Sequence, residues 1–120
     1  MHLKIRVDAH KNHINNSLSY LMEKIGNKEL FGEIDPNEDI IHILSISHII
    51  EDIIITDKKI VCSVKVLDTP SGKNIQELIN HKFELYFIPR IVNNEVITFD
   101  FKSTLNKRDL RDVKLSDLLD

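Results

Sequence analysis

Histidines are the first side chains in this sequence that could do chemistry, with six among 120 residues. His10 and His13 stand three residues apart and His2 is nearby in the sequence, which suggests a zinc site. A zinc site, however, needs three or four converging ligands on rigid elements, commonly with Cys or carboxylate partners. The spacings here match no zinc signature. We therefore expect no metal, and histidines that are solvated or packed in the interior.

Cys62 is the only cysteine, and it lies in the alternating apolar stretch "KKIVCSVKVL". A reactive thiolate needs a helix N-terminus or a neighbouring cation, and the middle of a strand offers neither. Free cysteine is also one of the most frequently buried residue types. A lone cysteine cannot form an internal disulfide, which fits a reducing compartment. We predict that Cys62 is a packing residue.

The stretch "TPSGK" at 69–73 could be taken for a phosphate-binding loop. That loop needs two glycines around four residues, followed by Lys and a hydroxyl residue, whereas this stretch has one glycine and no following hydroxyl. Capping of a helix explains it better, and we expect no cofactor.

Acidic side chains that could bind a cation or act as a base are Glu33, Asp35, Asp39, Glu51 and Asp52. Because they have no recognised metal-loop spacing, we expect solvated acidic faces.

Composition excludes several classes of function. The net charge is −3, and seven aromatic residues (two Tyr, five Phe) include no Trp, so neither a basic field nor a set of stacking rings indicates nucleic-acid binding. The longest apolar run, "IIEDIII", is interrupted by two acids, so we expect no membrane segment. The length fits one domain, placed at 1–106. The charged segment 107–120 is expected to be a short helix or an arm.

Apolar periodicity predicts the elements of the N-terminal half. Alternation over 3–7 indicates a strand, and apolar residues at helical spacing over 12–26 indicate a helix that stops at Gly26-Asn27. The stretch 29–39 reads as a strand end followed by a loop. Dense β-branched residues on both sides of "TDKK" predict a β-hairpin over 44–68.

The C-terminal half continues with a helix and a second hairpin. A helix over 69–81 can be capped by Thr69 or Ser71 and has Pro70 in its first turn. The hairpin over 82–103 turns at Asn93-Asn94, which tolerate positive φ. The order of strands and helices predicts an α+β domain with a small antiparallel sheet or barrel and two to three helices.

Three stretches taken together resemble the prohead core proteases of tailed phages, a family that shares the fold of the herpesvirus assemblin protease. They are "LFGEIDP" (30–36), "SISHIIEDIIITDKKIVCSVKVLDTPSGKNIQELI" (45–79) and "FELYFIPR" (83–90). Members of the family show a Gly-Glu-Leu segment ending in His-Pro, a Ser-His stretch, an LDTP-x-Gly-Lys turn and a strand with Gly-Val-Ser-x-Arg. The pattern is best kept at His48, Asp68, Gly72 and Arg90. The residues alone also allow a structural interpretation, with Asp68 and Gly72 in a strand-to-helix turn and Arg90 as a surface cation.

The catalytic residues that the resemblance implies do not align. The family's nucleophile is a serine just before the arginine, where this chain has Phe-Ile-Pro at 87–89. The family's catalytic histidine should fall in "GEIDPN", where Asp35 directly precedes Pro36. Ser103 with His42, or Ser47 with His48, could be imagined as a substitute pair. Adjacent strand residues point to opposite faces, however, which counts against the second pair. We therefore nominate no catalytic residue, and expect His48 at most to orient other groups.

These observations favour a non-catalytic phage protein of the prohead-protease-like fold with a binding role in capsid assembly or as a virion component. Its partners would be capsid or scaffold proteins, or further copies of itself, and its location the host cytoplasm or the virion. Two alternatives stay open: an active prohead maturation serine protease with an unusual catalytic set, and a small accessory protein that inhibits a host or phage enzyme. The aromatic residues of 84–92 and 95–103 suit strand addition at a sheet edge, although core packing is the more common role of such residues. The sequence does not single out the binding residues.

Overall fold

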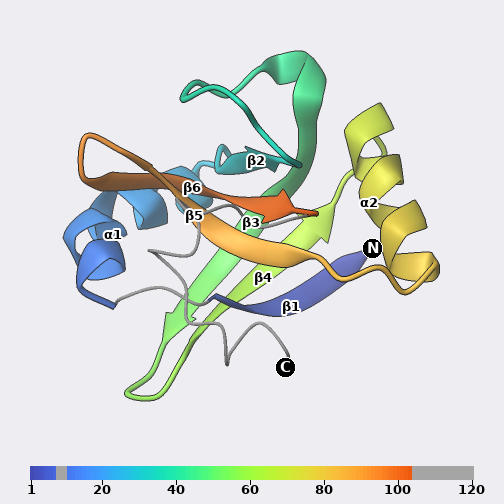
Figure 1. The fold of residues 1–120 in the computed structure, drawn as a ribbon. Helices are drawn as coiled ribbons and strands as arrows, with labels where there is room; N and C mark the ends of the chain where they lie inside the picture. The colour runs from blue at the N-terminus through green and yellow to red at the C-terminus, as the bar shows by residue number, and fades with distance from the viewer. Residues whose placement is uncertain (8–10, 104–120) are drawn as a thin grey trace.

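Six strands and two α-helices are formed by residues 1–7 and 11–103, the part of the chain that the computed structural model describes, without the side chains of 11–13. In chain order these elements, with one short 3₁₀ helix η1, are β1 (His2–Val7), α1 (Lys11–Gly26), β2 (Phe31–Glu33), η1 (Ile43–Ser45), β3 (Ile46–Ile55), β4 (Ile60–Val66), α2 (Pro70–Asn80), β5 (Tyr86–Val92) and β6 (Glu95–Lys102) (Figure 1). The predicted segment 107–120 and the domain boundary at 106 lie outside the described residues.

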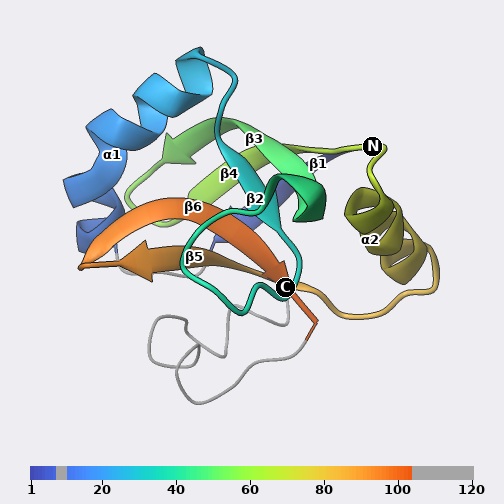
Figure 2. The ribbon, with the colours of Figure 1, turned by 90° about the horizontal axis from the view of Figure 1, so that it is seen from above.

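The strands form two small antiparallel sheets. One has the order β1-β4-β3-β2, and the other is the hairpin of β5 and β6. A parallel bridge between Ile34 and Phe101 joins them where β2 ends. Helix α1 packs against β6 and β3, and α2 packs against β3 and β4. The two helices lie on opposite sides of the strands (Figure 2). The predicted α+β class, with antiparallel pairing and two α-helices, is confirmed.

The first predicted hairpin begins later than its sequence indicated. Strand β3 starts at Ile46, and Leu44 and Ser45 belong to η1 instead. The reason is the shortness of the partner strand β2, whose last residue, Glu33, already pairs with Ile46. Leu44 and Ser45 therefore have no strand of β2 to pair with.

Local turn and cap chemistry matches the sequence. The Thr69 side chain caps α2 by accepting a hydrogen bond from the backbone N–H of Gly72 (3.0 Å), so Thr69 rather than Ser71 is the cap. Asn93 and Asn94 adopt φ values of 52° and 65° in the two-residue turn between β5 and β6. That geometry is typical of a tight hairpin turn, and the prediction is confirmed.

The core lies between the sheets and the helices, and the aromatic residues of the second hairpin are part of it. Phe87, Phe99 and Phe101 are buried, with the rings of Phe87 and Phe99 stacked 5.8 Å apart. The interpretation of these rings as core residues is confirmed. Cys62 is also buried in the core. Burial, and secondarily the charge of Asp52, raises the pKa of its thiol above the ordinary value.

Neither helix in the described part of the chain has the length and apolar character that crossing a bilayer requires.

Candidate functional site

Five polar side chains from four strands meet in the interior. We call this group the polar cluster, and it consists of Glu33 (β2), Ser47 and His48 (β3), Arg90 (β5) and Asp100 (β6). Their exposed fractions range from 0% for Ser47 and His48 to 8% for Arg90. Buried polar groups are costly unless they are hydrogen-bonded, so their partners decide what the cluster can do.

Arg90 is the centre of one half of the polar cluster. Its guanidinium donates two hydrogen bonds to Asp100, from Nε to Oδ2 (2.7 Å) and from Nη2 to Oδ1 (2.6 Å). Nη2 also donates to Glu33 Oε1 (2.8 Å), and Nη1 donates to the carbonyl of Ile40 (3.2 Å). The interpretations of Arg90 as a surface cation and of Glu33 as a solvated acid are therefore wrong. Asp35, Asp39 and Glu51, in contrast, are exposed.

The β5–β6 register explains why Arg90 meets Asp100. Arg90 lies opposite Thr98, and Asp100 is two residues further along β6, so the two charged side chains are diagonal neighbours on one face. Burial by itself would lower the pKa of the guanidinium, but the hydrogen bonds and charges of Asp100 and Glu33 outweigh it and raise the pKa. Arg90 is the one charged residue of β5, and Asp100 is a charge inside β6 between apolar residues; these two charges of opposite sign were the available sequence signal for this pair.

Ser47 and His48 form the other half, although the alternation of side chains along a strand counts against their acting together. The Ser47 Oγ atom lies 2.8 Å from His48 Nδ1, so the expectation that they face apart is wrong. The cause is a register shift: Gly32 pairs with His48 while Glu33 pairs with Ile46, which leaves Ser47 without a partner on β2. Such a bulge breaks the alternation of side chains along a strand.

The second ring nitrogen of His48 connects β3 to β6. His48 Nε2 lies 2.8 Å from the carbonyl oxygen of Phe99, and because a carbonyl only accepts, Nε2 carries the hydrogen. Burial, and more weakly the charge of Arg90, lowers the His48 pKa to about 4 against the opposing effect of the Phe99 bond. The ring is therefore neutral near pH 7, and Nδ1 accepts the hydrogen of the Ser47 hydroxyl.

Glycine at position 32 leaves the space for this connection. A Cβ atom on Gly32 would overlap both Nε2 of His48 and the carbonyl oxygen of Phe99. Gly72 in α2 also marks a close approach of backbone, because a Cβ there would overlap the carbonyl of Leu67. Close approach of backbone, rather than positive φ, thus explains both glycines. Asp68, the remaining family-pattern position, is exposed.

A serine hydroxyl donating to a neutral imidazole is the pairing of a nucleophile with its base. Here both side chains are 0% exposed, and the Ser47 Oγ also lies 3.3 Å from the carbonyl of Gly32. A substrate cannot reach such a pair unless the strands separate. The pair therefore acts in this structure as a structural connection between the two sheets.

The other positions considered for catalysis lie apart from this pair. Ile88 is buried on β5, at the place where the resemblance predicts the nucleophile. The Asp35 carboxylate accepts hydrogen bonds from the backbone N–H (2.9 Å) and hydroxyl (2.6 Å) of Ser103. His42 Nε2 lies 2.8 Å from Glu38 Oε2 and the Ser103 hydroxyl donates to Asp35, so each of these two side chains has a hydrogen-bond partner other than the other one.

The histidines considered for zinc are only partly described. His10 and the side chain of His13 lie outside the described residues, and His2 lies 3.1 Å from Glu51. The described residues contain no group of three His, Cys, Asp or Glu side chains that could hold a metal ion.

Comparison with known proteins identifies a structural neighbour. The sequence matches no family model and no curated protein. Among solved structures, the chain is similar to the capsid assembly protease gp21 of bacteriophage T4, with a TM-score of 0.62 and 14% sequence identity over 84% of this chain and 75% of that chain. At this identity the likeness shows the fold alone, and the chain has a prohead-protease-like α+β fold.

Proposed function

We propose that this chain is a non-catalytic protein of the prohead-protease-like fold that acts by binding, in phage capsid assembly or as a component of the virion. The observation that carries the proposal is the residue before Arg90. At the position where the resemblance implies a serine nucleophile, β5 presents the buried Ile88 followed by Pro89. Neither side chain has a hydroxyl or thiol that could form an acyl-enzyme.

The polar cluster supports the same conclusion. A catalytic base has to be within hydrogen-bond reach of a nucleophile that the substrate can approach. The described Ser47–His48 pair is sealed from solvent, and its second ring nitrogen is bound to a backbone carbonyl. Arg90, Asp100 and Glu33 bind one another. The side chains of the polar cluster therefore have their hydrogen-bond partners inside the protein, which suits a rigid scaffold for binding better than an enzyme.

Labelling with a fluorophosphonate probe tests the loss of catalysis. The full chain, read by intact-mass spectrometry, should gain no adduct under conditions in which an active serine protease is fully labelled. An adduct would overturn the proposal in favour of an active protease with an unusual catalytic set. A Ser47→Ala variant then serves as the matched control, because loss of the adduct in that variant would identify the nucleophile.

The binding role is tested with capsid and scaffold proteins encoded by the same genome. The tagged chain is mixed with each purified protein, and bound material is identified by mass spectrometry. Recovery of an intact capsid or scaffold protein supports the proposal. Recovery of the same proteins cleaved at defined sites contradicts it. In a parallel pull-down from host-cell lysate, selective recovery of one host enzyme, with loss of its activity, would favour the inhibitor alternative.

A further inference from the structure

The two ends of β3 carry surfaces of opposite character. Residues 38–44, which we call the acidic loop, end one residue before β3, and the turn 56–59 directly follows β3. Ten residues of strand at about 3.3 Å each span about 33 Å. This matches the longest extent of the molecule, 33 Å. The acidic loop and the turn therefore lie at opposite ends of the fold, as Figure 1 shows at its top and its lower edge.

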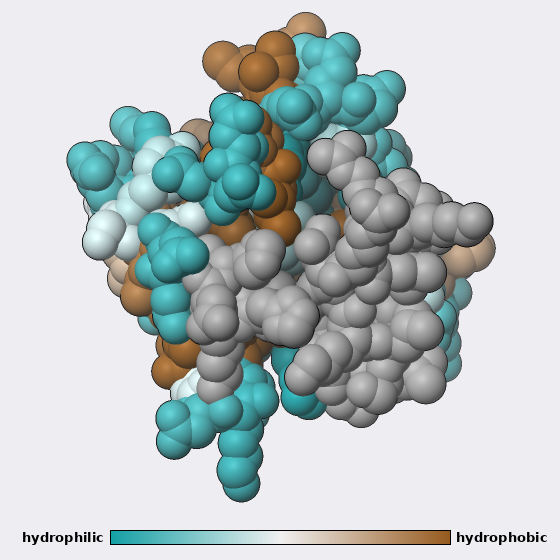
Figure 3. Space-filling view, turned by 60° about the vertical axis from the view of Figure 1, so that its left-hand side comes forward, coloured by the Kyte–Doolittle hydropathy of each residue, from teal (hydrophilic) through white to brown (hydrophobic). Residues whose placement is uncertain are grey.

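The acidic loop exposes apolar side chains to an unusual degree. Ile40 is 64% exposed, Ile43 81% and Leu44 90%. Glu38 and Asp39, immediately before them, are exposed as well. Brown apolar surface gathers at the top of the molecule in Figure 3, where Figure 1 places this loop. Contiguous exposed apolar residues with a polar rim indicate an interaction site.

The loop is held in place before any partner arrives. The buried guanidinium of Arg90 donates to the carbonyl of Ile40 (3.2 Å), and the backbone N–H of Ser45 donates to the carbonyl of His42 (2.9 Å). Such fixed geometry reduces the ordering cost of binding.

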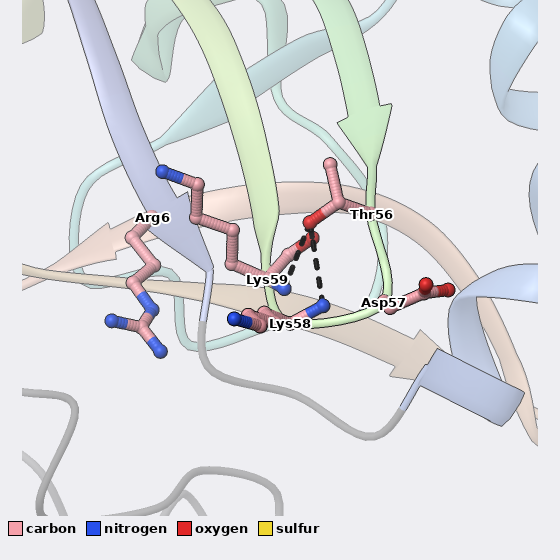
Figure 4. A pocket seen from close by; sticks show the side chains of 5 residues that line it. All are labelled: Arg6, Thr56, Asp57, Lys58 and Lys59. Carbon is pink, nitrogen blue, oxygen red and sulfur yellow. Dashed lines mark hydrogen bonds between the residues drawn. The ribbon is translucent and has the colours of Figure 1, made fainter.

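The opposite end of β3 carries a basic pocket of about 540 Å³, lined by Arg6, Thr56, Asp57, Lys58 and Lys59 (Figure 4). The Thr56 hydroxyl oxygen accepts from the backbone N–H groups of Lys58 (3.4 Å) and Lys59 (3.1 Å), which fixes the turn. Asp57 points away from the cationic side chains in Figure 4. Arg6 already has an interaction within the chain, so the charge argument rests on the two lysines. Their aliphatic stems offer apolar surface, and their ammonium groups offer positive charge.

We propose that the acidic loop of one copy docks into the basic pocket of a second copy, so that the protein self-associates head to tail. Ile43 and Leu44 would pack against the lysine stems, while Asp39, together with Glu38 and its neighbour His42 (2.8 Å), faces the ammonium groups. A second copy is the occupant that the charges favour, because one chain carries both halves and β3 keeps them apart. The inference rests on these surfaces and not on the proposed role in the capsid.

A contact between two different surfaces has a testable geometry, because it propagates into a ring or an open filament. Sedimentation velocity of the full chain, up to about 1 mM, should show oligomers in about 0.1 M salt that dissociate in about 1 M salt, where the screening length falls from about 10 Å to about 3 Å. The loop variant Glu38→Lys/Asp39→Lys and the pocket variant Lys58→Glu/Lys59→Glu should each associate at least about tenfold more weakly.

Mixing the two variants is the decisive measurement. The reversed loop of the first fits the reversed pocket of the second, and their native loop and native pocket fit each other, so the mixture should associate again. The control Lys65→Glu/Lys73→Glu changes the net charge by the same amount as the pocket variant, at exposed positions away from the pocket. It should associate like the native chain. Leu44→Asn should weaken association without changing the unfolding midpoint, because its side chain is exposed.

Three results would overturn the inference. A native chain that stays monomeric across the concentration series lacks the contact. A pocket variant that associates normally would mean that the loops bind each other or another surface. A mixture that stays dissociated would show that the two surfaces are not partners. If the native chain is monomeric and the loop variant loses binding to a capsid protein, the acidic loop serves that partner instead.

Discussion

Replacing Arg90 with methionine should destabilise the fold more than any other single change in the polar cluster. The substitution keeps a long side chain but deletes the two bonds to Asp100, the bond to Glu33 and the bond to the Ile40 carbonyl. Both carboxylates then stay in the interior without the cation that balances them, since Glu33 and Asp100 are 3% and 2% exposed.

The size of the effect follows from this burial. Removing one partner of a buried ion pair costs about 3–5 kcal/mol, because a buried charge is left uncompensated. An exposed pair contributes only up to about 1 kcal/mol. A domain of this size has a free energy of unfolding of about 5–15 kcal/mol, so Arg90→Met should remove about a fifth of it or more.

Urea unfolding followed by far-UV circular dichroism measures the loss, since the chain has no Trp for fluorescence. The triple variant Glu33→Gln/Arg90→Met/Asp100→Asn should regain much of the stability, because it removes the charges and keeps an acceptor for the backbone N–H of Glu33. Lys24→Met is the exposed control, with its pair to Glu29 at 3.5 Å, and should cost under about 1 kcal/mol. A loss from Arg90→Met as small as that of the control, with no recovery in the triple variant, would refute the reasoning.

Three further predictions concern the connection between the sheets and the core. Gly32→Ala should lower the free energy of unfolding by about 2–4 kcal/mol in chemical denaturation, because its Cβ would overlap His48 and the Phe99 carbonyl. In the control Gly26→Ala the new Cβ meets open space, so this variant should be as stable as the native chain or more stable. Equal effects of the two substitutions would contradict the prediction. The His48 pKa is about 4 in the fold against 6.5 for the free side chain, so the unfolded chain binds a proton first. The free energy of unfolding should therefore fall by up to about 3 kcal/mol through His48 as the pH falls from 6.5 toward 4. Urea unfolding of the His48→Gln variant should lack this loss of stability. The prediction is wrong if the stability of the native chain and of the variant depends on pH in the same way. Cys62 should resist iodoacetamide in the folded protein and react fully in denaturant, as mass spectrometry would record; rapid labelling of the native chain would show that the thiol is accessible.

Much of the fold was readable from the sequence because its signals are local. Alternation over 60–66 and the positive φ of Asn93 and Asn94 depend only on neighbouring residues, as does the cap at Thr69. The order of short motifs also indicated the prohead-protease-like fold, which the structural neighbour bears out. These features need no knowledge of which strands finally meet.

The polar cluster and the acidic loop depended on tertiary structure. The buried Arg90 has Glu33, 57 residues away in the chain, as one of its partners only because β2 brings Glu33 to it. Ser47 turns toward His48 only because β2 pairs with β3 through a bulge. The apolar residues before Ile46 remain exposed because β2 is too short to pair with them. Hydrophobicity and charge along the chain set what each segment can do, but pairing between distant strands decides which side chains become buried partners and which become surface.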